Sequence, residues 1–208
     1  MEGETGSPLG FFKSLIHRGA GGALAIALIL LYLEEGCIGR IRASQILGYP
    51  ERRLRSLIDI LVEEGILERQ EYRTCISGRV RSILSGLRVE RVRRDKYTLC
   101  FYKGLGPEAT GLVVEKISRL RDYLVIELRD PNVFEVIGVA GTNGFFFPGV
   151  PDELAARYAD LIGEYRGEEA IVVLWRRYKA YLYDGALIYS LVKLDVDGDE
   201  DTGSVHGY

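Results

Sequence analysis

Histidine and cysteine are scarce in this chain, and their scarcity limits the chemistry that it can perform. The 208 residues include two histidines, His17 and His206, and each lies near an end of the sequence. The three cysteines, Cys37, Cys75 and Cys100, form no CxxC pair, so we expect neither a disulfide framework nor a zinc site. A reducing, cytoplasmic location fits this pattern. We therefore expect no histidine-dependent catalysis, no metal and no cofactor.

Long apolar runs are also missing, which argues against a membrane span. The longest run, residues 23–33, has 11 residues, whereas a membrane-spanning helix needs about 20. A signal-peptide core is the alternative, because Lys13 and Arg18 precede the run. Glu34 and Glu35 follow it at once, however, and no small-residue cleavage site is present. We interpret the run as a buried helix of a protein without a membrane partner.

Amides are rare, and the charges are unevenly distributed. Asparagine and glutamine occur twice each, and 21 of the 27 basic residues are arginine, a composition that fits a thermophile. The net charge is −3, but residues 36–94 carry 13 basic and 7 acidic side chains, and residues 95–208 carry 12 and 19. A basic front and an acidic rear indicate two modules with different partners.

The basic region has the order of elements of a helix-turn-helix followed by a hairpin. Residues 38–41 read as a short strand, 42–47 as a short helix closed by Gly48, and 51–64 as a second helix that Pro50 opens. Apolar residues of that helix recur at the spacing of one helical face. Residues 66–69 and 74–76 read as hairpin strands, and 78–85 as a further helix. We assign residues 11–86 to this domain.

The outward face of the second helix has side chains that suit nucleic acid. Arg52 and Ser56 face outward and can bond base edges, and Arg53 and Arg55 flank them at positions suited to phosphates. Asp59 and Glu63 follow on the same face and would repel DNA, unless only the start of the helix enters the groove. The candidate DNA-binding residues are Arg42, Ser44, Arg52, Arg53, Arg55, Ser56, Arg69 and Arg73.

This segment resembles the winged helix-turn-helix of prokaryotic transcription regulators. The resemblance lies in residues 43–48 (ASQILG), the arginine-rich helix through Leu61, and residues 64–67 (EGIL). Residues 76–79 (ISGR) resemble the start of the helix after the wing, although two residues are missing here. The whole chain is also similar to an uncharacterised archaeal family with a C-terminal α/β domain of unknown function, through Arg121-Asp122 and residues 144–149 (GFFFPG). This second resemblance implies no reaction and no catalytic residue.

The rear of the chain predicts an architecture and no chemistry. From Tyr97 the order of elements is β-α-β-β-α-β-α, which indicates an antiparallel sheet with helices on one face. We assign residues 87–194 to a two-layer α/β sandwich, ferredoxin-like or related, so that the whole chain is α+β. Residues 138–144 are glycine-rich but lie between two strands, so they read as a tight turn, not a phosphate loop. Residues 195–208 read as a disordered acidic tail.

These features favour a dimeric DNA-binding transcriptional regulator, not an enzyme. Its expected partners are double-stranded DNA, a second copy of the chain and a small-molecule effector, with the second domain as the dimerisation or effector-sensing part. The alternative is a protein–protein interaction module that uses its winged helix without DNA. The acids Asp59 and Glu63 favour that alternative.

Overall fold

The chain divides into two compact units, each with its own core. The computed structural model describes residues 6–202, and side-chain environments as far as residue 197. Within that range, unit 1 comprises residues 6–85 and 179–189, and unit 2 comprises residues 86–178 and 190–202. The sequence assigned residues 87–194 to one second domain, whereas the structure groups 179–189 with the first unit. The α+β class is confirmed, because both units mix helices with antiparallel strands.

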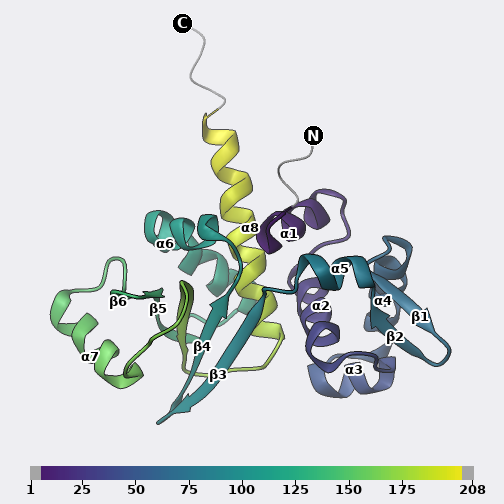
Figure 1. Ribbon diagram of the computed structural model, residues 1–208, viewed down its shortest axis with the longest axis horizontal. Coiled ribbons are helices and arrows are strands. Elements are labelled where there is room, and N and C mark those ends of the chain that lie inside the picture. The colour runs from purple at the N-terminus through teal and green to yellow at the C-terminus, as the bar shows by residue number, and fades with distance from the viewer. Residues whose placement is uncertain (1–5, 203–208) are drawn as a thin grey trace, which may run out of the picture. The chain divides into compact units, whose positions relative to one another are not determined.

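Unit 1 is built around the apolar run of the sequence (Figure 1). Its elements are α1 (Pro8–His17), α2 (Ala23–Glu35), α3 (Arg40–Leu47), α4 (Glu51–Glu63), β1 (Leu67–Gln70), β2 (Arg73–Ile76), α5 (Gly78–Ile83) and the start of α8 (Leu182–Thr202). The run lies in α2, where every residue from Ala25 to Tyr32 is buried. This confirms that the run is a core helix. No helix in the described part of the chain is long and apolar enough to cross a membrane.

The start of α8 belongs to unit 1 because it packs closely against α2. A Cβ atom at Gly185 would lie 2.3 Å from the Ala23 carbonyl oxygen, so only glycine permits this approach. The Tyr181 hydroxyl donates to carboxylate oxygens of Glu34 and Glu35 at 3.1 and 3.3 Å. These long-range contacts were not visible in the sequence, which placed the last helix with the rear module.

The predicted disordered tail is wrong in its first part. Residues 195–202 continue α8, and residues 203–208 lie outside the described range. The helix continues because its side chains find partners on α6 (Pro107–Leu128). Asp197 accepts a hydrogen bond from the Tyr123 hydroxyl, and the Lys116 ammonium donates to the Leu194 carbonyl oxygen at 3.3 Å. Composition alone did not reveal these tertiary contacts.

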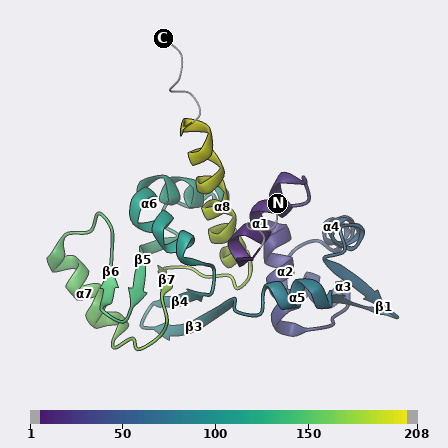
Figure 2. The ribbon, with the colours of Figure 1, turned by 45° about the horizontal axis from the view of Figure 1, so that its top comes forward.

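Unit 2 contains a five-stranded antiparallel sheet with the order β3-β4-β7-β5-β6 (Figure 2). Its elements are β3 (Arg88–Arg94), β4 (Tyr97–Lys103), α6, β5 (Phe134–Gly141), β6 (Gly144–Phe146), α7 (Asp152–Ile162), β7 (Ala170–Trp175) and the remainder of α8. The Thr142-Asn143 turn joins β5 to β6, which confirms the glycine-rich stretch as a hairpin turn. The order of elements from Tyr97 is the predicted one.

Helices cover both faces of this sheet, so the predicted two-layer sandwich is wrong. Leu99 and Phe101 point to one face, where their core includes Ile162 of α7. Trp175 points to the other face, since its register partner Thr98 alternates with Leu99 along β4. Phe134 packs against Trp175 there, and Arg121 of α6 lies over the Phe134 ring. Every residue of β7 is accordingly buried.

The strand order also differs from the ferredoxin-like expectation. That arrangement places the first and third strands of the β-α-β-β-α-β unit in the centre of the sheet. Here the fourth and second strands, β7 and β5, lie in the centre, and β4 and β6 lie outside them. The order of elements along the chain is compatible with both arrangements, so it did not distinguish them.

A disulfide between Cys37 and Cys75 contradicts the expectation of three free thiols. Ile38 and Thr74 exchange two backbone hydrogen bonds of 3.0 Å, so the next antiparallel pair, Cys37 and Cys75, lies close, with 4.2 Å between Cα atoms. Cys100 is the free cysteine and is buried. The predicted strand at 38–41 is reduced to this single bridge, because α3 already begins at Arg40.

Candidate nucleic-acid interface

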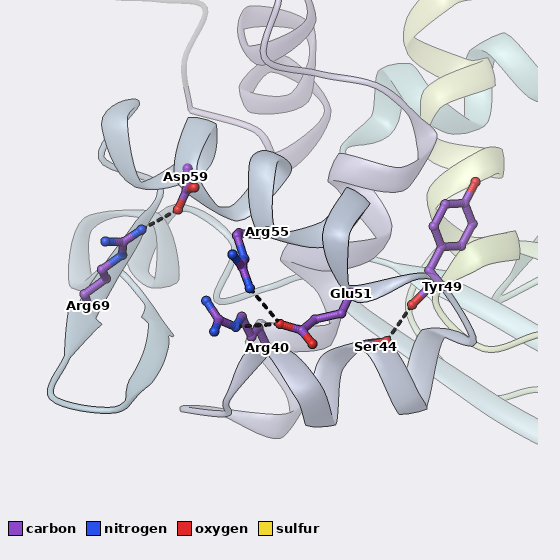
Figure 3. Close-up of polar contacts among 7 residues, drawn as sticks. All are labelled: Arg40, Ser44, Tyr49, Glu51, Arg55, Asp59 and Arg69. Carbon is purple, nitrogen blue, oxygen red and sulfur yellow. Dashed lines mark hydrogen bonds and ion pairs between the residues drawn. The ribbon is translucent and has the colours of Figure 1, made fainter.

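A tight turn fixes α4 relative to α3. Gly48 has a φ of 62°, a left-handed conformation that favours glycine. The Ser44 hydroxyl donates to the Tyr49 carbonyl oxygen at 2.6 Å, and Pro50 precedes the first turn of α4 (Figure 3). Ser44 was a candidate DNA contact, but in the structure its hydroxyl donates its hydrogen bond within this turn.

The buried stripe of α4 determines which of its side chains face outward. Leu54, Ile58 and Leu61 are buried, at 0%, 4% and 0% exposure. Arg52, Arg53, Arg55 and Ser56 are all exposed in consequence. The predicted outward face at the start of the helix is therefore the one that forms.

A groove lies between α4, the start of α3 and the β1–β2 hairpin. Its volume is about 430 Å³. The lining residues are Gly39, Arg40, Ile41, Arg55, Ile58, Asp59, Arg69, Glu71, Tyr72, Arg73 and Thr74. Three of the candidate residues, Arg55, Arg69 and Arg73, therefore meet in this groove. Arg42, Ser44, Arg52, Arg53 and Ser56 lie outside its lining.

Two carboxylates beside the groove, those of Glu51 and Asp59, are paired with arginines of the same unit, whereas Glu71 of the lining forms no ion pair within residues 6–202. Glu51 accepts from Arg40 at 2.8 Å and from Arg55 at 3.3 Å (Figure 3). Asp59 pairs with Arg69, which reaches across from β1. The negative charge of Asp59 is thus compensated by Arg69, a pairing that the sequence did not indicate. The same pairs engage Arg55 and Arg69, both of which were candidate DNA contacts.

Four candidate arginines have no acidic partner within residues 6–202. Arg42, Arg52, Arg53 and Arg73 are exposed, and none of them forms an ion pair in that range. Their guanidinium groups lie on α3, on the first turn of α4 and on β2. This arrangement leaves positive charge on each element that borders the groove. Guanidinium groups suit phosphate oxygens and guanine edges, which both accept two hydrogen bonds.

Two residues of this surface were not predicted from the sequence. Ile41 is 61% exposed, and Tyr72 is 96% exposed at the hairpin tip. Tyr72 could have been found, because a two-residue loop at 71–72 leaves its side chain without neighbours. Arg40, a basic residue beside the first helix of the motif in the sequence, is engaged by Glu51.

The hairpin that forms one wall of the groove is short and tied down at its base. β1 and β2 pair over four residues each, from Leu67↔Ile76 to Gln70↔Arg73. A two-stranded hairpin of this size is marginally stable by itself. The Ile38–Thr74 bridge and the Cys37–Cys75 disulfide connect β2 to the segment before α3. They therefore join the two walls of the groove.

Unit 2 has a second polar centre, around Glu135 of β5. The carboxylate accepts from the Tyr158 hydroxyl at 3.0 Å, the Tyr97 hydroxyl at 3.2 Å and Arg176 Nε at 2.6 Å. Burial acts to raise the pKa of Glu135, but these hydrogen bonds and the charge of Arg176 outweigh it and hold the pKa below its usual value.

A cavity of about 230 Å³ adjoins Glu135, with lining residues from α6, β5 and α7 that include Arg121, Val136 and Leu154. The lining combines one carboxylate and one guanidinium with apolar walls. Residues 6–202 hold no group of three or more side chains arranged to bind a metal ion. This centre offers a small ligand a place.

Comparison with known proteins shows a fold and no function. The sequence matches no known protein family, and no curated protein is similar to it. The structure is similar to that of the hypothetical protein PH0730 from Pyrococcus horikoshii OT3, with a TM-score of 0.53 and 20% sequence identity. The likeness covers 83% of this chain and 92% of that chain. At this identity it speaks for the fold alone.

Proposed function

We propose that unit 1 is a winged helix-turn-helix that binds duplex DNA, and that the protein is a transcription regulator. In this proposal α3 and α4 are the helix-turn-helix, and the β1–β2 hairpin is the wing. The first turns of α4 enter the major groove with Arg52 and Ser56, while Arg42, Arg53 and Arg73 contact the backbone.

One observation carries the proposal: Glu51 and Asp59 beside the groove are compensated, whereas Arg42, Arg52, Arg53 and Arg73 form no ion pair within residues 6–202. Glu71 also lines the groove and is the acid there without an ion pair in that range. Glu51 and Asp59 are held by Arg40, Arg55 and Arg69. The repulsion that these acids would exert on phosphates is thereby reduced. Glu63 lies at the far end of α4, away from the turns that enter the groove in this docking.

The test is binding of the full chain to a fluorescent 30-base-pair duplex over a salt series. Because each neutralised phosphate contributes about 0.9 to the slope of log affinity against log salt, Arg52→Ala plus Arg53→Ala should lower the slope by about 0.9, through the lost phosphate contact of Arg53. The matched control is Arg157→Ala plus Arg166→Ala, which removes two exposed arginines from unit 2. A wild-type slope indistinguishable from zero would refute the proposal.

Unit 2 is the dimerisation and effector part of the proposed regulator. Phe146 and Ile126 are 56% and 70% exposed, and they offer apolar area to a second copy. The cavity beside Glu135 offers a place for an effector. A dimer predicts two half-sites about 34 Å apart on the DNA.

A protein partner for the same groove is the second candidate function. The exposed Ile41 and Tyr72 favour it, since an aromatic side chain and an aliphatic one beside a groove are typical anchors of protein interfaces. Under this alternative, the Arg52 and Arg53 substitutions leave duplex binding at the wild-type level, and Tyr72→Ser weakens capture of the partner.

A further inference from the structure

One end of the five-stranded sheet of unit 2 carries a second concentration of positive charge. We call it the sheet-end surface and define it by Arg93, Arg94, Lys96, Arg176 and Arg177, all of which are exposed. Residues 95–208 carry 12 basic and 19 acidic side chains, so the charge balance of this part of the chain is negative. The sheet topology nevertheless gathers these cations at one end.

The strand register shows why two distant segments meet there. Arg94 pairs with Tyr97 across the two-residue turn 95–96, so the β3–β4 hairpin ends at this point. Trp175, the last residue of β7, pairs with Thr98 of β4. Residues 176–178 therefore leave the sheet beside the β3–β4 turn, although more than 75 residues separate the two segments in the sequence.

Acidic neighbours compensate only part of this charge. Arg176 pairs with Glu135 at 2.6 Å and Arg177 with Asp130 at 3.7 Å. Within residues 6–202, Arg93, Arg94 and Lys96 form no ion pair. Lys96 lies over the Tyr97 ring, 5.2 Å from its centroid, and Arg93 reaches the Thr98 hydroxyl at 3.5 Å. Asp95 is the one acid within the turn itself.

Protection of a sheet edge accounts for part of this pattern but not for all of it. β3 is an edge strand, and charged side chains on an edge discourage pairing with another sheet. Arg88 and Glu90 of β3 suit that purpose. Lys96 lies in the turn, and Arg176 and Arg177 follow the central strand β7, so none of them guards the edge.

We infer that the sheet-end surface binds the phosphate backbone of a nucleic acid, as a contact separate from the helix-turn-helix of unit 1. Arginine predominates, and its planar guanidinium pairs with phosphate through two hydrogen bonds. Large apolar side chains are nearly missing from the strand and turn, where Val92, at 37% exposure, is the exposed one. A protein interface would be expected to offer buried aromatic anchors. The inference rests on the proposed function for the identity of the polyanion.

The experiment compares salt slopes for the same duplex with the full chain. Arg93→Gln plus Arg94→Gln keeps the side-chain length and removes two charges, so the slope should fall by about 1.8. At about 0.1 M salt the affinity should fall on the order of tenfold or more. Arg93→Lys plus Arg94→Lys keeps the charge and the edge protection, and should keep the slope. Circular dichroism and size exclusion show whether each variant is folded and unaggregated, and Arg157→Ala plus Arg166→Ala is the charge-matched control.

The outcomes separate this inference from the proposed function. If the Gln variant binds like the wild type while Arg52→Ala plus Arg53→Ala lowers the slope, the inference is wrong and the proposed function stands. If only the Gln variant lowers the slope, the inference stands and the proposed function is wrong. A wild type without salt-dependent binding overturns both. Loss of binding to phosphatidylserine-containing vesicles in the Gln variant, with unchanged DNA binding, assigns the surface to lipid and overturns the inference.

Discussion

The two hairpins β1–β2 and β3–β4 have nearly the same tip but are held in place by different means. Each has a two-residue turn whose first residue, Glu71 or Asp95, is acidic and has a positive φ, of 52° and 51°. Arginines flank both turns. β1–β2 forms a two-stranded sheet that a disulfide connects to the segment before α3. β3–β4 is part of a five-stranded sheet, and Tyr97 beside its turn bonds to Glu135 of β5.

This difference shows what an exposed, charged hairpin needs in order to keep a fixed position. The four-residue strands of β1–β2 bury little apolar area, so a covalent link and one backbone bridge supply the anchoring. The strands of β3–β4 have seven residues each, and β4 is hydrogen-bonded on both sides. A noncovalent network is sufficient there. The two anchors should therefore respond to different perturbations.

The largest expected effect is the removal of the covalent anchor. Cys37→Ser plus Cys75→Ser opens a link across 38 residues, and loop-closure entropy predicts a loss of about 4 kcal/mol in the free energy of unfolding of unit 1. Urea unfolding with and without a reducing agent measures this loss. Wild type treated with dithiothreitol should behave as the double variant does.

Thiol counting provides the control for this prediction. Denatured wild-type protein without a reducing agent should contain one reactive thiol, that of Cys100. A count of three would show that the link is not formed in solution. A loss below about 1 kcal/mol would show that the Ile38–Thr74 bridge anchors the hairpin without the disulfide.

A smaller effect is expected from the polar anchor of β3–β4. Glu135→Gln removes the charge that holds Arg176, and a lost hydrogen bond to a charged group costs about 2 kcal/mol. The Glu135 side chain is 17% exposed, so solvent screens the interaction only in part. Glu164→Gln is the control, because the Glu164–Arg166 pair is more than 80% exposed on both sides and should contribute little.

The pH dependence of this variant follows from the lowered pKa of Glu135. A carboxyl whose pKa is lower in the folded state stabilises the fold above its unfolded value, here about 4.5, and loses that contribution as the pH falls through the folded value. The difference in unfolding free energy between wild type and Glu135→Gln should thus be constant near neutral pH and narrow below 4.5. A difference that widened in acid would contradict this assignment.

The two anchors also show which features of the structure could be predicted from the sequence and which could not. The spacing of Leu54, Ile58 and Leu61 predicted α4 and its outward face, and Asn143-Gly144 predicted the β5–β6 turn, because these signals are local. Neither anchor is local. Cys37 meets Cys75 only through the bridge beside them, and Tyr97 meets Glu135 only through the order of the strands.

The candidate interface shows the same division between local and tertiary information. Exposure of Arg52, Arg53 and Ser56 follows from helical periodicity, which the sequence contains. The pairing of Asp59 with Arg69 requires the hairpin to lie against α4, which no periodicity encodes. The objection that Asp59 would repel DNA was therefore reasonable from the sequence and is weakened by the structure.

The smallest expected effect comes from the two turns themselves. A left-handed conformation costs an ordinary L-residue roughly 1–2 kcal/mol, and aspartate tolerates it better than glutamate because its short side chain can bond locally. Glycine removes that cost but adds about 0.5–1 kcal/mol of unfolded-chain entropy. Glu71→Gly should therefore stabilise unit 1 by about 0.5 kcal/mol, and Asp95→Gly should leave unit 2 nearly unchanged.

The reciprocal substitution Gly65→Ala, at a φ of 68° with no neighbouring atom within 4 Å of the added Cβ, should destabilise unit 1 by about 1 kcal/mol. Thermal melts of the three variants rank these effects. A larger gain in stability from Asp95→Gly than from Glu71→Gly would contradict this ranking. It would show that the anchors of the two hairpins, and not the residues of the turns, determine the conformation of both tips.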